Sequence, residues 1–166
     1  MAELSQKHFD DLYYALGFIT FHWAIIERLM DDCIKITYHG YDGKSIKIPI
    51  PKTRLSSKIE LLKQYFNKLP KLRQYKDAGL NIIEIIDTLS EKRHWFIHGV
   101  IVKIEPDYLH YTKYQYGSEI STINYLQFKA ADLPVYGKKL VDLVTEFAPF
   151  VQNLINKYAL EQAGKQ

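Results

Sequence analysis

The chain has 166 residues, of which 47% are hydrophobic and 25% charged, and 22 Lys and Arg against 19 Asp and Glu give a formal charge of +3. This composition excludes intrinsic disorder and predicts a single globular domain over residues 1–166. Cys33 is the single cysteine, so no disulfide can form within the chain. Because no apolar run reaches the ~20 residues of a membrane span and no signal peptide is visible, we expect a soluble cytoplasmic protein.

A helix is the first predicted element, over residues 5–37. Its apolar residues recur at spacings of three and four, which predicts one buried face: Leu12, Leu16, Ile19, Trp23, Ile26, Met30, Cys33 and Ile36. An extended loop is predicted over 44–53, because Pro49 and Pro51 disfavour regular structure there. A second helix is then expected to begin at a capping Ser56 or Ser57.

The second half of the chain changes its period at Gly99. A third helix is predicted over 72–95, and the segments after it are β-branched, aromatic and partly alternating, as in strands. The last helix is expected to begin at Asp132, to kink at Pro149 and to fray over about 161–166. The predicted fold is mainly α: an up-and-down bundle of four to five helices, with a small antiparallel β insertion at about 100–128, built from strands 100–104, 108–116 and 120–128.

Charge is strongly segregated along the chain. Residues 44–76, the basic block, hold ten basic residues and one acidic residue, a balance of +9, whereas residues 1–40 have a balance of −3. Such a block attracts polyanions, and Arg54, Lys58 and Lys63 are its candidate RNA-binding residues. The alternative is a solvated helix face whose lysines are neutralised by acids elsewhere in the fold.

The most informative six residues close the third predicted helix: Arg93-His94-Trp95-Phe96-Ile97-His98. One interpretation is a metal site, because His94 and His98 share a helix face, but no third ligand is evident beyond Glu91. A second is structural, with an imidazole at the helix end and Arg93 paired to an acid. A third is cleavage of RNA, which carries its own 2′-hydroxyl nucleophile: His, with a reference pKa of about 6.5, moves protons, and Arg holds the phosphate.

Helix geometry constrains the third interpretation. Arg93 and His98 are five residues apart, which corresponds to about 140° around a regular helix. On such a helix the two side chains would not converge on one phosphate. Either the helix loosens before Gly99, or two chains assemble the site across a two-fold axis.

The same six residues resemble the ribonuclease signature of HEPN domains, which is Arg, a polar residue, three variable residues and His. Arg93, His94 and His98 match it in order, and Gly99 follows as it does in many bacterial and phage-defence members. The helical bundle with the motif late in the chain is similar to the family's architecture, except for the β insertion. The chain is therefore identified as resembling a HEPN domain.

This resemblance implies a metal-independent endoribonuclease without a cofactor, whose RNA site lies in a composite homodimer cleft. His98 and Arg93 are the implied catalytic residues, and His94 assists. Family members serve as toxins with nucleotidyltransferase-like antitoxins or as defence effectors, and others are non-catalytic modules that bind a nucleotide or a protein partner. The two classes of function stay open at this point.

Glu27 is the candidate supporting residue of the site. It falls on the inward stripe of the first helix, four residues after Trp23 and three before Met30. A carboxylate there requires a partner because burial of an unpaired charge is costly. Arg93 is one candidate, and a solvent-exposed pairing with another base is the alternative.

Overall fold

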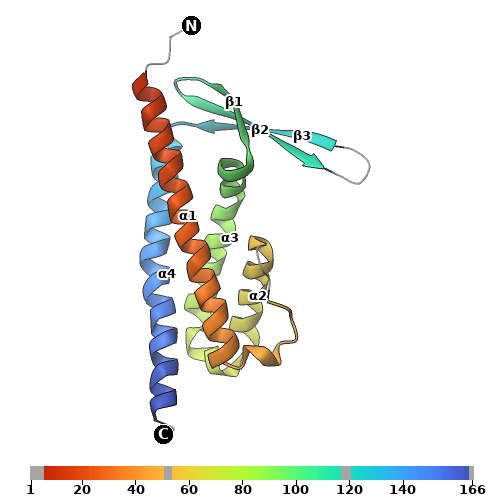
Figure 1. The fold of residues 1–166 in the computed structure, drawn as a ribbon, viewed down its shortest axis with the longest axis vertical. Coiled ribbons are helices and arrows are strands. Elements are labelled where there is room, and N and C mark those ends of the chain that lie inside the picture. The colour runs from red at the N-terminus through yellow and green to blue at the C-terminus, as the bar shows by residue number, and fades with distance from the viewer. Residues whose placement is uncertain (1–5, 51–53, 117–120, 165–166) are drawn as a thin grey trace. The chain divides into compact units, whose positions relative to one another are not determined.

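The computed structural model describes residues 6–50, 54–116, 121–164, leaving out the segments between them and both ends. Four long helices, two short 3₁₀ helices and three strands make up the described residues (Figure 1). Their order is α1 (Gln6–Gly40), η1 (Gly43–Ser45), α2 (Leu55–Lys68), η2 (Pro70–Tyr75), α3 (Lys76–His98), β1 (Val100–Ile104), β2 (Tyr108–Tyr116), β3 (Ser121–Lys129) and α4 (Asp132–Ala163). The mainly α fold with a small antiparallel sheet before the last helix is confirmed.

Several predicted boundaries shift by a few residues. Helix α2 begins at Leu55 with Arg54 as its N-cap and no side-chain cap, so the predicted serine cap is wrong: Ser56 and Ser57 lie inside the first turn. Residues 70–75 form a 3₁₀ helix because Pro70 occupies its first turn, and α3 follows from Lys76. Helix α4 contains Pro149 and continues to Ala163, into the segment for which fraying was predicted.

The chain divides into two compact units, and the division falls inside three of the long helices. The sheet unit comprises residues 1–23 and 90–141, and the helical unit comprises residues 24–89 and 142–166. Helices α1, α3 and α4 therefore each contribute one part to each unit, and α2 lies wholly in the helical unit. Within the described ranges, no helix combines the length and the apolar character that a membrane span requires.

The helical unit is held by apolar side chains from the four helices. Among its buried residues are Ile26, Met30, Cys33, Leu62, Tyr65, Phe66, Ile83, Ile86 and Leu154. Helices α2 and α3 approach closely at Gly79, where a Cβ atom would lie 2.6 Å from the Phe66 ring. Burial raises the pKa of Cys33 to about 12, so this thiol is an unreactive core residue, as its place on the stripe predicts.

The sheet unit is organised around one face of the antiparallel sheet, whose strand order is β1-β2-β3. Strand β2 directs alternate residues to this face, where Leu109 and Tyr111 are buried, and Phe128 of β3 joins them from opposite Leu109. Phe96 of α3 packs against this face, with its ring centroid 5.9 Å from that of Tyr111 and 5.0 Å from that of Phe128. The β insertion therefore covers the end of α3.

Candidate functional site

The six-residue segment from Arg93 to His98 forms the last turns of α3, within the sheet unit. The helix stays regular through His98, so the alternative in which it loosens before Gly99 is wrong. Gly99 ends it by donating a hydrogen bond from its N–H to the Trp95 carbonyl oxygen at 2.8 Å. A Cβ at Gly99 would lie 2.5 Å from that same oxygen, so a glycine is needed where α3 turns into β1.

Arg93 is half-buried against aromatic side chains. Its guanidinium carbon lies 5.9 Å from the centroid of the Trp23 ring, within the range of a cation–π contact. Trp23 is fully buried and donates a hydrogen bond from Nε1 to the Tyr136 hydroxyl at 2.9 Å. The planar cation is therefore held on a rigid platform, which fixes its direction before any ligand binds.

Tyr136 is the second part of this platform. Burial raises its pKa to about 12, although the hydrogen bond from Trp23 and the positive charge of Arg93 act in the opposite direction. The phenol is therefore neutral at ordinary pH and serves as a hydrogen-bond acceptor for Trp23. Its ring also contacts Phe96, with 5.2 Å between centroids, which ties the platform to the face of the sheet.

The two imidazoles lie on another side of the helix end. His94 and His98 are both exposed, and their ring centroids are 5.1 Å apart in an edge-to-face arrangement with an interplanar angle of 69°. The shared face expected from their four-residue spacing is present. Two groups that can carry protons thus face solvent together, while the Arg93 guanidinium packs against Trp23.

A cation that sequence reasoning missed lies beside this pair. The Lys113 Nζ atom of β2 contacts Nε2 of His94. Lys113 is two residues after buried Tyr111 and four after buried Leu109, so strand alternation directs it to the face that covers α3. That alternation was the available signal, but the sequence did not show that this face meets the end of α3.

The metal interpretation requires a third ligand beside the two imidazoles. Among the described residues, no group of three or more His, Cys, Asp or Glu side chains is arranged to hold a metal ion. Glu91, one turn before His94, therefore does not complete such a group. An ammonium in contact with His94 also opposes a second cation at the same nitrogen.

Glu27 is half-buried on α1. It belongs to the helical unit, whereas Arg93 belongs to the sheet unit. Its supporting role beside Arg93 stays a prediction.

The candidate RNA-binding residues of the basic block differ in exposure. Arg54 is exposed at the N-cap of α2. Lys63 is partly exposed and forms an ion pair with Asp87 at 2.6 Å. The Lys58 side chain is only 4% exposed and binds Asp31 at 2.6 Å, so it is not a surface contact for RNA. The prediction that Lys58 binds RNA is therefore wrong, because its ammonium is enclosed by the helical unit and neutralised there.

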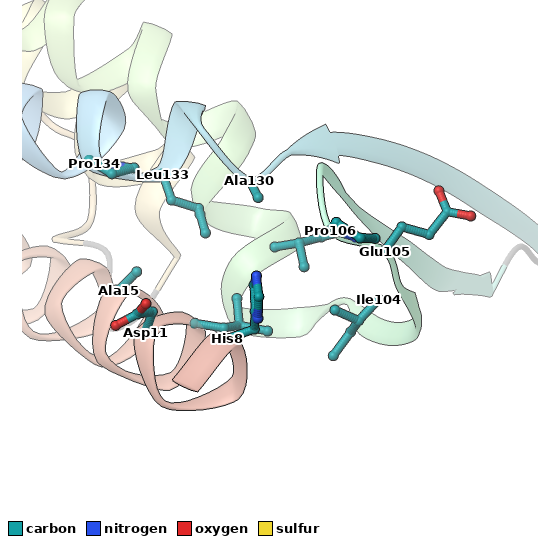
Figure 2. Close-up of a pocket in the computed structure, with 11 residues that line it drawn as sticks. His8, Asp11, Ala15, Ile104, Glu105, Pro106, Ala130, Leu133 and Pro134 are labelled. Atoms are coloured by element: carbon teal, nitrogen blue, oxygen red, sulfur yellow. The ribbon is translucent and has the colours of Figure 1, made fainter. Parts of the chain in front are cut away.

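The sheet unit also contains a small hollow, with a volume of about 180 Å³ (Figure 2). Its lining is mainly apolar and comes from the start of α1, the turn between β1 and β2, and the start of α4. Figure 2 shows the Glu105 carboxylate pointing away from the other lining side chains, consistent with its ion pair to Lys103 and its hydrogen bond with His110. None of Arg93, His94 and His98 lines this hollow, so it is separate from the motif.

Comparisons with known proteins leave the resemblance to rest on these residues alone. No family model, no curated protein and no solved structure matches the chain.

Proposed function

We propose that the chain is a metal-independent endoribonuclease of HEPN type. The observation that carries the proposal is the end of α3, where Arg93 is held over Trp23 and two exposed imidazoles lie with their centroids 5.1 Å apart. A planar cation suits a phosphate, and adjacent imidazoles suit proton transfer near neutral pH. RNA is the substrate class that needs no further nucleophile.

In the proposed reaction the 2′-hydroxyl oxygen of RNA attacks the adjacent phosphorus and gives its proton to an imidazole, with His98 as the acceptor. The bond from phosphorus to the 5′ oxygen breaks, and that oxygen takes a proton from a second imidazole or from water. The products are a 2′,3′-cyclic phosphate and a free 5′-hydroxyl. Arg93 stabilises the charge that develops on the phosphate oxygens.

Two protomers are part of the proposal. The regular helix through His98 separates Arg93 from His98 by about 140° around its axis. In a two-fold dimer, Arg93 of one protomer and His98 of the other would meet at one phosphate. A toxin or defence effector of the cytoplasm with such a cleft would be held inactive by a partner such as a nucleotidyltransferase-like antitoxin. Arg54 and Lys63 would attract the RNA backbone electrostatically.

A second candidate function, a non-catalytic module that binds a protein partner, is supported by the exposed aromatic residues of α1. Tyr13, Tyr14 and Phe21 expose 65%, 75% and 62% of their surfaces. Exposed aromatic clusters of this kind are typical of protein interfaces. The same residues also suit a second protomer, so they do not decide between the two functions.

The deciding experiment compares the wild type with His98→Ala on labelled single-stranded RNA in excess chelator. We expect cleavage by the wild type, a 2′,3′-cyclic phosphate product, and a loss of rate of about 10²–10⁴-fold in the variant. His39→Ala, which removes an exposed imidazole of the helical unit, is the matched control and should cleave like the wild type. An inactive wild type would favour the binding module, and activity lost only with chelator would favour a metal site.

A further inference from the structure

The packing of strand β2 against α3 places Lys113 next to the two imidazoles. Tyr111, two residues earlier on the same face, is only 2% exposed and packs edge-on against Phe96 of α3. The missing side chain of Gly99 allows this approach, because a Cβ there would lie 3.0 Å from the Tyr111 ring. The position of Lys113 is therefore set by the same packing that holds the sheet unit together.

In the contact between Lys113 and His94, the donor and the acceptor of the hydrogen bond can be assigned. An ammonium only donates hydrogen bonds, so Nε2 of His94 is the acceptor in this contact, which requires the neutral tautomer that carries its proton on Nδ1. Two N–H groups of the ammonium remain for other acceptors. Within the described residues Lys113 has no carboxylate partner, whereas Lys103 of the same sheet is paired with Glu105.

An anion is the ligand that this arrangement favours. The ammonium of Lys113 and the two imidazoles come together at the end of α3, and Arg93 is directed against Trp23. A phosphate that reaches His98 would meet Lys113 as the cation of the same protomer. The interaction is strong because it pairs opposite charges through hydrogen bonds.

We propose that Lys113 is a phosphate-binding residue of the site, contributed by the β insertion, and that it keeps His94 as a neutral hydrogen-bonding group. The inference rests on the proposed ribonuclease function and extends it. It assigns the proton transfers to His98 and the charge stabilisation to two cations, Arg93 and Lys113. The β insertion, which lies outside the resemblance to HEPN domains, thereby becomes part of the active site.

Cleavage rates provide the first test. Lys113→Gln removes the charge with little loss of side-chain length, and we expect its cleavage rate to fall about 10- to 100-fold. Lys113→Arg should keep most of the rate because it retains a donor cation. Lys103→Gln, at a paired lysine of β1 with 63% of its side chain exposed, is the matched control and should cleave like the wild type.

RNA binding provides the second test and does not depend on cleavage. In a His98→Ala background, the slope of log affinity against log salt concentration should fall by about 0.7 when Lys113 becomes Gln, the value for one phosphate contact on a single strand. Lys103→Gln in the same background should keep the slope. Circular dichroism and thermal melting establish that each variant is folded.

The outcomes separate this inference from the proposed function. If the wild type cleaves and His98→Ala does not, but Lys113→Gln matches Lys103→Gln in rate and slope, the inference alone is overturned. If the wild type does not cleave, the ribonuclease proposal fails, and the salt slope still decides whether Lys113 contacts phosphate. If Lys113→Gln is unfolded, Lys113→Arg decides. The inference is overturned if a folded Lys113→Arg variant cleaves as slowly as His98→Ala and has also lost its affinity for RNA.

Discussion

The cations of the basic block and those at the end of α3 make different contacts. In the basic block, Lys58, Lys63 and Lys71 bind Asp31, Asp87 and Asp42, with nitrogen–oxygen distances of 2.6, 2.6 and 2.8 Å. At the end of α3, the guanidinium of Arg93 lies over an indole ring and the ammonium of Lys113 contacts an imidazole. Three of the ten basic residues of the block are thus paired with carboxylates of the helical unit. Net charge along a chain indicates where cations are, but not which of them a ligand can reach.

The largest expected effect is the recovery of cleavage when two inactive variants of the end of α3 are mixed. Arg93→Ala and His98→Ala should each reduce cleavage on the order of 10²–10⁴-fold, because each removes one half of the composite site. In an equimolar mixture that exchanges protomers, half of the dimers are mixed, and one of their two Arg93–His98 pairs across the two-fold axis is intact, so about a quarter of the wild-type rate should return. Initial rates on labelled RNA measure this recovery.

The control mixture combines the double variant Arg93→Ala/His98→Ala with Arg93→Ala, and it should recover nothing because no protomer supplies the arginine. If the first mixture also stays at the level of the single variants although mass measurements show mixed dimers, Arg93 and His98 act within one chain. In that case the regular helix would not keep Arg93 and His98 of one protomer from acting on the same phosphate.

The periodicity of the sequence was sufficient for most of the fold. The stripe of α1 predicted a helix over 5–37, which runs from Gln6 to Gly40, and the alternation after Gly99 predicted three strands within a residue of their bounds. The spacing of apolar residues along a segment shows which of its faces is buried, so long amphipathic segments are the easiest to predict. The 3₁₀ helix at Pro70 was missed because a tight turn next to a helix has no period of its own.

The candidate site was predictable only in part, because its residues come from distant segments. The face shared by His94 and His98 follows from spacing on one helix. The contact between Lys113 and His94 joins residues 19 apart across two elements, and the alternation of β2 does not reveal what its face covers. Likewise, the sequence shows the charge of Lys58 but neither its burial nor its partner Asp31.

Stability measurements test the ion pairs of the basic block. Lys58→Ala should lower the free energy of unfolding by about 1–3 kcal/mol, because it leaves Asp31 without its partner and removes a buried stem. Lys63→Ala, at a pair whose side chains are 38% and 48% exposed, should cost no more than about 1 kcal/mol. Urea unfolding measures both values.

Lys58→Ala should change RNA affinity much less than Lys113→Gln does. The assignment of the basic block to internal ion pairs would be wrong if Lys58→Ala kept its full stability while its salt slope for RNA fell. In that case Lys58 would contact phosphate in solution, and the basic block and the end of α3 would bind the same RNA.

The last prediction concerns Tyr136, which lies beside Trp23 in the platform under Arg93. Tyr136→Phe removes the acceptor of the Trp23 indole N–H and should lower the free energy of unfolding by about 1–2 kcal/mol near neutral pH. Urea unfolding of both proteins measures this value. The deficit should shrink in alkali, because the pKa of Tyr136 is raised to about 12 in the fold against about 10 in the unfolded chain.

The sign follows from which state binds the proton more tightly. The wild type keeps the full contribution of Tyr136 below about pH 10 and loses it as the pH rises toward about 12, since only the unfolded phenol ionises in between. Other buried tyrosines such as Tyr111, whose pKa burial also raises to about 12, are present in both proteins and cancel in the difference. A difference that stays constant from about pH 8 to about pH 11 would mean that Tyr136 titrates normally. In that case the Tyr136 hydroxyl would be solvated in the fold, and Arg93 would not rest on a buried pair of Trp23 and Tyr136.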